Sequence, residues 1–192
     1  MPPFFVSNTS AMANPIIRVV IRSRFTLTSR QSAGAQAAQH LNSYLRLAQG
    51  VSETAGSKPV TVPPMLGVDE DMRAWSFFML LRHNTIVNHA ISANVKRLAL
   101  GEPEPAKKFD AKKDVMPGAG CGIEQIALFK SSVLSHLEAV KSLGELRGTK
   151  TTDHPLFGPF DAHKWHCMFA FHMQIHLKQA EFVRASAVGA SG

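Results

Sequence analysis

The sequence predicts an all-α protein: a four-helix bundle preceded by an N-terminal extension. Four long segments carry apolar residues at helical spacing, and segments rich in proline and glycine separate them. The chain shows no internal repeat and no alternation of strands with helices, and its 192 residues suffice for one core. We expect the bundle over residues 30–187, the extension over 1–29 and a disordered tail over 188–192.

The first two helices are expected over residues 30–53 and 69–100, on either side of a Pro/Gly-rich linker. The first segment is rich in Ala, Gln and Leu. The second begins with acidic residues and ends with Lys96 and Arg97 before Gly101. This is the order of charges that the helix dipole favours, followed by a glycine stop.

The last two helices are expected over residues 122–147 and from Asp161 to about residue 187. A long loop precedes the third helix, and apolar residues at helical spacing share one of its faces. A second Pro/Gly-rich turn precedes the fourth, for which Asp161 is the expected N-cap.

The net charge of +7 is concentrated at the N-terminus. The first 52 residues hold five arginines and no acidic residue, whereas the remainder holds 16 basic and 14 acidic side chains. Because the bundle itself is nearly balanced and has no dense basic stripe, we expect no nucleic-acid partner. No apolar run is long enough to cross a bilayer, so we expect no membrane partner either.

The extension, residues 1–29, has two interpretations. Arg18 and Arg22 would share one helix face in a segment rich in arginine and serine, as in an organelle transit peptide. The alternative is an extension or strand-like arm that leads into the first helix. The two cysteines, Cys121 and Cys167, give no sign of an oxidising compartment. We expect a cytoplasmic protein, with organelle targeting as the alternative.

Four histidines lie close together in the last helix. On a helical wheel, His172 and His176 lie about 40° apart, within the apolar stripe that must face the core. His163 and His166 fall on the other side of the wheel and are expected at the surface. Two imidazoles are therefore predicted to point inward.

The second helix carries one comparable residue, since His83 lies in the middle of its apolar stripe, whereas Asn84 and Asn88 are expected to face solvent. Burying a polar group without a partner costs about 1–3 kcal/mol, so three inward histidines make a costly core. Two histidines four residues apart, with a third from a facing helix, can hold one metal ion and leave a position open. Three separately hydrogen-bonded histidines are the alternative.

The absence of two known motifs narrows the kind of metal site that these histidines could form. The segment HMQIH lacks the glutamate of the HExxH proteases, and no ExxH pair of the di-iron bundles is present. Imidazole ligands suit Zn²⁺, Ni²⁺, Cu²⁺ or Fe²⁺ better than Mg²⁺ or Ca²⁺.

Three further residues are candidates around such a site. Gln179, one turn after His176, either orients a metal-bound histidine or fills the core with a satisfied amide. His136 is a candidate extra ligand or base, or a histidine at the helix edge. His154, in the turn HPLFGPF, either shapes the mouth of a pocket or simply closes the bundle end. Cys167 lies too far round the wheel to be a ligand.

One histidine midway along the second helix, followed by HxxxH on the fourth, resembles the DinB/YfiT-like family. The resemblance covers residues 30–187 and is most specific in HPLFGPFDAHKWHCMFAFHMQIHLKQAEF, where HPxFG, W and HxxxHLxQ look like an uncharacterised subgroup. It implies an up-down-down-up bundle, often homodimeric, with a divalent metal, usually zinc or nickel, on His83, His172 and His176. Characterised relatives are transferases or isomerases that use low-molecular-weight thiols.

We therefore expect a metal-dependent enzyme of transferase or hydrolase type that acts on a small molecule, with a low-molecular-weight thiol as a candidate co-substrate. The sequence names no general base. The alternatives are a non-catalytic metal- or ligand-binding bundle, with a stress-related role, and a purely structural protein with buried histidines. Phe171 and Phe182, on one flank of the last helix, are expected either to form a homodimer interface or to pack against the first helix.

Overall fold

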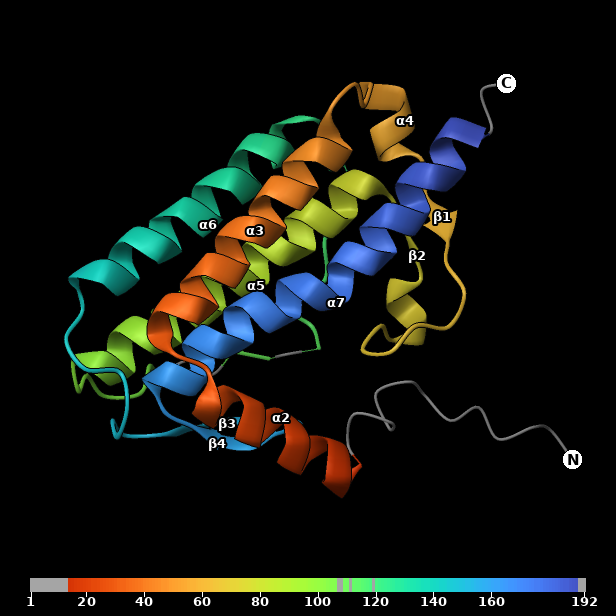
Figure 1. The fold of residues 1–192 in the computed structure, drawn as a ribbon. Helices are drawn as coiled ribbons and strands as arrows, with labels where there is room; N and C mark the ends of the chain where they lie inside the picture. Colours follow the sequence, from red (N-terminus) through yellow and green to blue (C-terminus); the bar gives the residue numbers. More distant parts are fainter. Residues whose placement is uncertain (1–13, 107–108, 111, 119, 190–192) are drawn as a thin grey trace, which may run out of the picture.

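A computed structural model describes residues 14–106, 109–110, 112–118 and 120–189. Its core is a bundle of four helices: α3 (Arg30–Ala48), α5 (Phe77–Ala99), α6 (Glu124–Ser142) and α7 (Ala162–Gly189). Helices α3 and α7 run in one direction and α5 and α6 in the other, so the order is up-down-down-up (Figure 1). Helix α7 packs against both α3 and α5, and α6 closes the bundle against α5 and α3. The predicted all-α bundle is confirmed.

Two short antiparallel strand pairs pack against α7. Between α3 and α5 the chain forms α4 (Glu53–Ser57), β1 (Val60–Thr61), the 3-10 turn η1 (Glu70–Met72) and β2 (Ala74–Trp75). Strand β1 pairs antiparallel with β2, and β3 (Thr152–His154) pairs antiparallel with β4 (Gly158–Phe160) just before α7. None of the helices in the described residues is long and apolar enough to cross a bilayer.

The bundle helices are somewhat shorter than expected. Helix α5 begins at Phe77 rather than near residue 69, because the Ser76 side chain caps it by accepting a hydrogen bond from the Met79 backbone N–H. The acidic residues ahead of it form η1 instead. Helices α3 and α6 likewise end at Ala48 and Ser142, several residues before the predicted ends.

Helix α7, in contrast, is longer than expected. Asp161 Oδ1 accepts a hydrogen bond from the Lys164 backbone N–H at 2.9 Å, which is the contact expected of an N-cap. The helix continues to Gly189, two residues into the segment for which a disordered tail is predicted. Residues 190–192 of that tail lie outside the described residues.

Much of the extension is helical, so the strand-like interpretation is wrong for these residues. Helix α2 (Pro15–Leu27) starts with a proline at its first position, and the Asn14 side chain accepts a hydrogen bond from the Ile16 backbone N–H. Both features favour helix initiation. Residues 1–13, which belong to the same predicted extension, lie outside the described part of the chain.

Helix α2 packs against the end of the bundle where α7 begins (Figure 1). The Phe25 ring meets Phe160 and Phe171 edge-on, with ring centroids 5.8 Å and 5.7 Å apart. Phe171 therefore contacts α2, and its predicted packing against the first bundle helix stays a prediction. Phe182 remains 38% exposed, and its predicted role in a homodimer stays a prediction.

Candidate metal centre

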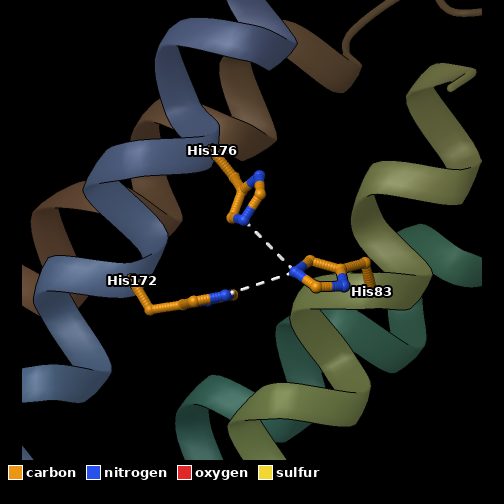
Figure 2. Close-up of side chains that lie close together, drawn as sticks. All are labelled: His83, His172 and His176. Carbon is orange, nitrogen blue, oxygen red and sulfur yellow. Dashed lines mark hydrogen bonds between the residues drawn. The ribbon is translucent and has the colours of Figure 1, made fainter. Parts of the chain in front are cut away.

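Three histidines from two neighbouring helices meet inside the bundle. His83 projects from α5, and His172 and His176 project from successive turns of α7 (Figure 2). The Nε2 atom of His83 lies 3.2 Å from the Nε2 atom of His172 and 3.2 Å from that of His176. Candidate ligand atoms of all three lie within 4.8 Å of one another. The convergence predicted from the sequence is confirmed.

Hydrogen bonds at the other ring nitrogens fix the protonation of two of these imidazoles. His83 Nδ1 lies 2.8 Å from the carbonyl oxygen of Val115, which can only accept, so Nδ1 carries the hydrogen. His176 Nδ1 lies 2.9 Å from Gln179 Oε1. The Gln179 amide cannot be reversed, because its Nε2 donates to the Met72 carbonyl at 2.7 Å. His176 Nδ1 is therefore also a donor.

It follows that His83 and His176 direct unprotonated Nε2 atoms at each other across 3.2 Å. A neutral imidazole carries one N–H, which is already committed at Nδ1 in both residues. His172 has a single ring hydrogen, so it can donate to only one of these two Nε2 atoms. Facing lone pairs in a buried space repel each other, and a shared cation would turn the repulsion into attraction.

None of the three rings takes up a second proton at neutral pH, so protonation does not remove this repulsion. Burial, with the neighbouring His176, lowers the pKa of His83 to about 3. Burial lowers the pKa of His176 to about 4, although the Gln179 hydrogen bond and the Asp69 carboxylate act in the opposite direction. Burial and the two neighbouring imidazoles also hold the pKa of His172 well below its usual value. All three rings are neutral, which is the form that binds metals.

The two spacings from His83 Nε2 fit a transition-metal ion. Two ligands about 2.0–2.1 Å from a tetrahedral zinc ion lie about 3.3–3.4 Å apart, and two adjacent ligands of an octahedral ion about 3.0 Å apart. The observed 3.2 Å falls between these values. Among the described residues no carboxylate or thiol joins this three-histidine group. The group could therefore hold an ion and leave further coordination positions open.

The environment of the three rings is unequal. Trp75 lies against His83, with ring centroids 5.0 Å apart. The Nδ1 atom of His172 is buried and has no hydrogen-bond partner in the described part of the chain, unlike the Nδ1 atoms of His83 and His176. His172 is thus the least constrained of the three rings.

The structure does not bring His136 to this centre. Its Nε2 lies 3.0 Å from His166 Nδ1, its Nδ1 lies 2.9 Å from Ser92 Oγ, and its ring stacks on Phe169 with centroids 3.7 Å apart. His136 is 1% exposed, so it is a core residue rather than one at the helix edge. Cys167 is also outside the three-histidine group, as predicted.

His154 lies in the aromatic cluster at the bundle end. Its ring stacks on Phe157 at 4.8 Å between centroids and lies 5.4 Å from the Trp165 ring, and its Nδ1 accepts the Leu156 backbone N–H. It is close enough to His172 to contribute to the lowered pKa of that residue. A role for His154 at the mouth of a pocket stays a prediction.

The expectation that His163 and His166 lie at the surface is wrong, since each is 1% exposed. His163 Nε2 donates to the carbonyls of Phe25 and Thr28, at 3.1 Å and 2.9 Å, and His166 Nε2 donates to the carbonyl of Arg30 at 3.0 Å. The end of α2 and the start of α3 therefore cover this side of α7. The helical wheel did not include a covering helix in the extension.

The expectation that Asn84 and Asn88 face solvent is also wrong, since both are 0% exposed. Asn84 Nδ2 donates to the Leu80 carbonyl at 2.9 Å, and Asn88 Nδ2 donates to Ser132 Oγ of α6 at 3.0 Å. Helix α5 packs against both α6 and α7, so it is buried on more than one side. Amide side chains at these positions are part of the core.

Comparison with known proteins supports the fold and leaves the family open. No protein-family model matches this chain, and no curated protein matches it. The structure is similar to the crystal structure of TT2238, described as a four-helix bundle protein. The TM-score is 0.55 at 20% sequence identity, over 80% of this chain and 98% of the other. Likeness at this identity shows the fold alone, so membership of the DinB/YfiT-like family stays a prediction.

Proposed function

We propose that this protein is a metal-dependent enzyme of transferase or hydrolase type that acts on a small molecule. In this proposal the Nε2 atoms of His83, His172 and His176 hold one divalent transition-metal ion. The observation that carries it is the contact of 3.2 Å between the Nε2 atoms of His83 and His176, whose hydrogens are committed elsewhere. A cation shared between them is the simplest way to stabilise this contact.

Zinc and nickel are the ions that we propose for the site. An all-imidazole ligand set favours these borderline ions over Mg²⁺ and Ca²⁺, which prefer oxygen ligands. The hydrogen bonds from His83 to Val115 and from His176 to Gln179 are of the kind that orient metal-bound histidines and make them more basic. The resemblance to the DinB/YfiT-like family supports the same choice of ions and suggests a low-molecular-weight thiol as co-substrate.

When bound, an ion with only three protein ligands supplies Lewis-acid chemistry, which makes a coordinated water or thiol more acidic at neutral pH. The histidines hold the ion in place and do not themselves transfer protons. Trp75 against His83 and the tight packing around His176 exclude bulk water from one side of the centre. Exclusion of water strengthens electrostatic effects inside such a site.

A non-catalytic metal-binding bundle is the second candidate, and one observation favours it. Two surface pockets, of about 270 Å³ and 230 Å³, are lined by residues other than the three histidines. One lies beside Lys96 and Arg97 at the end of α5, and the other lies beside Cys121 and Ser76 at its start. A substrate held in either of these two pockets would not contact the three histidines.

The first test is the metal content of protein purified without added metal or chelator, measured by elemental mass spectrometry. We expect about one ion per chain in the wild type and none in the His83→Ala and His172→Ala variants. His89→Ala, which removes an exposed histidine of the same helix, is the matched control and should retain the ion. Stoichiometric metal in His83→Ala would show that the ligand set is wrong.

The second test separates the enzyme from the binding bundle. The metal-loaded protein is assayed with thiol-transfer and ester-hydrolysis substrates before chelation, after chelation and after metal is restored. An activity that chelation removes and metal restores supports the enzyme. A protein that retains its metal and turns over none of these substrates supports the non-catalytic alternative.

A further inference from the structure

Helix α2 presents apolar residues on two opposite faces. The inner face packs against the start of α7 and strand β4 through Ile21 and Phe25, which are 8% and 2% exposed. The opposite face carries four large apolar side chains in open contact with solvent: Ile16, Val19, Val20 and Leu27, which are 73%, 63%, 60% and 85% exposed. We call these four residues the outer stripe.

The outer stripe occupies one sector of the helix, in which the exposed Ser23 separates Val20 from Leu27. At 100° per residue its four members fall within about 100° of the helix circumference. They account for four of the eleven exposed large apolar side chains among the described residues, on a helix of 13 residues. Single exposed apolar residues need no explanation, but four on one face of a short helix mark a contact surface.

The groups that border the outer stripe are basic. Arg24 is exposed about 40° from Val20 on the helical wheel, and no acidic residue occurs in the first 52 residues of the chain. Arg18 lies on the other side of α2, where its guanidinium approaches Gly158 of the β3–β4 hairpin. Arg147 reaches the end of the helix and donates to the carbonyls of Thr26 and Thr28 at 3.0 Å and 2.8 Å. Any partner of this face must therefore accept apolar side chains and positive charge together.

Helix α2 is also firmly attached to the bundle. The Arg22 guanidinium donates to the carbonyls of Phe157 and Pro159 at 2.6 Å and 3.1 Å, which joins α2 to the β3–β4 hairpin. Helix α2 lies at one end of the molecule (Figure 1), so the outer stripe that it carries is a preformed surface there. A preformed surface loses little conformational freedom on binding.

We propose that α2 docks this protein on an anionic lipid surface. The outer stripe inserts between the headgroups, and Arg24 binds a lipid phosphate at its edge. An apolar stripe bordered by arginines, on a helix of low overall hydrophobicity, is typical of helices that lie in the plane of a membrane. The proposal departs from the expected absence of a membrane partner, which rested only on the lack of a spanning segment.

The charge and shape of α2 favour a lipid surface over other partners. Two copies of the chain that met through this face would bring two arginine-bordered helices together, and like charges oppose that contact. A peptide ligand needs a groove, whereas the outer stripe lies on the convex side of a single helix. An anionic bilayer is flat, apolar below its surface and negative at it.

The test is co-sedimentation of the full chain with vesicles of two compositions. One is phosphatidylcholine alone, and the other contains seven parts of phosphatidylcholine to three parts of phosphatidylglycerol. We expect binding to the anionic vesicles that weakens as salt is added, and little binding to the neutral ones. The variant Val20→Asp should weaken binding roughly ten-fold or more, because it removes one apolar anchor and adds a negative charge.

Leu134→Asp is the matched control, since Leu134 is an exposed apolar residue of α6 that is 48% exposed. It should bind vesicles as the wild type does. Changing Arg24 to glutamine should weaken binding to anionic vesicles by about five-fold and carries the test if Val20→Asp fails to fold. Circular dichroism and thermal unfolding check the fold of every variant.

Three results would overturn the proposal. The first is an absence of binding to anionic vesicles at low salt, and the second is equal binding by the Val20→Asp variant and the wild type. The third is a dimer in sedimentation velocity that Val20→Asp dissociates, which would assign the outer stripe to a second copy of the chain. Metal content is expected to be unchanged in Val20→Asp, so this test is independent of the proposed enzyme.

Discussion

Gln179 is the residue at which the proposed metal centre can be perturbed without touching a ligand. Its Oε1 accepts the hydrogen of His176 Nδ1 at 2.9 Å, and its Nε2 donates to the Met72 carbonyl at 2.7 Å. The side chain is 0% exposed, so water cannot replace either contact. Gln179→Leu keeps a similar volume and removes both hydrogen bonds.

The expected losses of metal affinity and of stability follow from these two contacts. Removal of a hydrogen-bond partner from a metal-bound histidine typically lowers metal affinity by about 10- to 100-fold, which corresponds to about 1.4–2.8 kcal/mol. Each buried group that loses its partner costs about 1–3 kcal/mol of stability. We therefore expect Gln179→Leu to bind metal about 10- to 100-fold more weakly and to unfold at a lower temperature in the metal-free form.

The conservative variant Gln179→Glu separates the two contacts. A carboxylate still accepts the hydrogen of His176 Nδ1 and makes the imidazole a stronger ligand, but it cannot donate to the Met72 carbonyl. We expect this variant to retain its metal affinity while the metal-free protein loses stability. Gln174→Leu, at a partly exposed position of the same helix, controls for the loss of an amide.

Competition for Zn²⁺ or Ni²⁺ with a chromophoric chelator measures the affinity, and thermal unfolding with and without metal measures the stability. We expect Gln179→Glu to bind metal at least as tightly as the wild type and Gln174→Leu do. Gln179→Leu should bind metal clearly more weakly than all three. If Gln179→Leu bound metal as tightly as Gln174→Leu, the hydrogen bond would not orient His176 for an ion and the assignment would fail.

Two further predictions test the fold and its buried histidines. Burial lowers the pKa of His83 and His136 to about 3 and of His166 and His176 to about 4, below the unfolded value of about 6.5. On acidification the unfolded chain therefore binds protons before the folded chain does. The stability of the metal-free protein should fall between about pH 6.5 and 4, by up to about 1.4 kcal/mol per pH unit for each such histidine. A thermal unfolding temperature that does not change with pH would contradict this. Gly56→Ala places a Cβ within the Phe78 ring and should cost about 1–3 kcal/mol in denaturant unfolding, whereas Gly144→Ala, where a Cβ meets nothing within 4 Å, should cost little.

The bundle and the inward direction of three histidines were predictable because both depend on local periodicity. A helical wheel places His172 and His176 on one face whatever surrounds the helix, and it places His83 within the apolar residues of α5. The packing of α5 against α7 then brings the two faces together. The hydrogen bond from His83 to Val115 was not predictable, because the loop that carries Val115 has no periodicity to read.

The wheel failed where a helix is buried on more than one side. His166 and Asn88 lie opposite or beside the stripe that was taken as the buried face, yet both are buried. Helix α7 contacts α3, α5 and α2, and α5 contacts α6 and α7, so neither has a simple polar face. A signal was present in the extension: Ile21 and Phe25 are four residues apart and large, a spacing typical of a helix that packs against a core.

Comparison of the two histidine clusters in this fold separates a structural histidine from a candidate ligand. In one cluster, donors and acceptors can alternate. The Ser92 hydroxyl, which also lies 2.6 Å from the Asn88 carbonyl, can donate to His136 Nδ1 instead; His136 Nε2 then donates to His166 Nδ1, and His166 Nε2 donates to the Arg30 carbonyl. With the Ser92 hydroxyl in that direction, each neutral ring gives one hydrogen and accepts one, so protein groups alone can complete the cluster.

The cluster of His83, His172 and His176 cannot be completed in this way. The Val115 carbonyl and the Gln179 amide oxygen each take the single hydrogen of a ring, and the nitrogens that remain face each other. Burial alone does not distinguish the clusters, since His136 is as buried as His83. What distinguishes them is the direction of the hydrogen bonds at the outer nitrogens. Protein groups that take hydrogens from two rings leave electron pairs at a common point, and a cation is the species that such a point attracts.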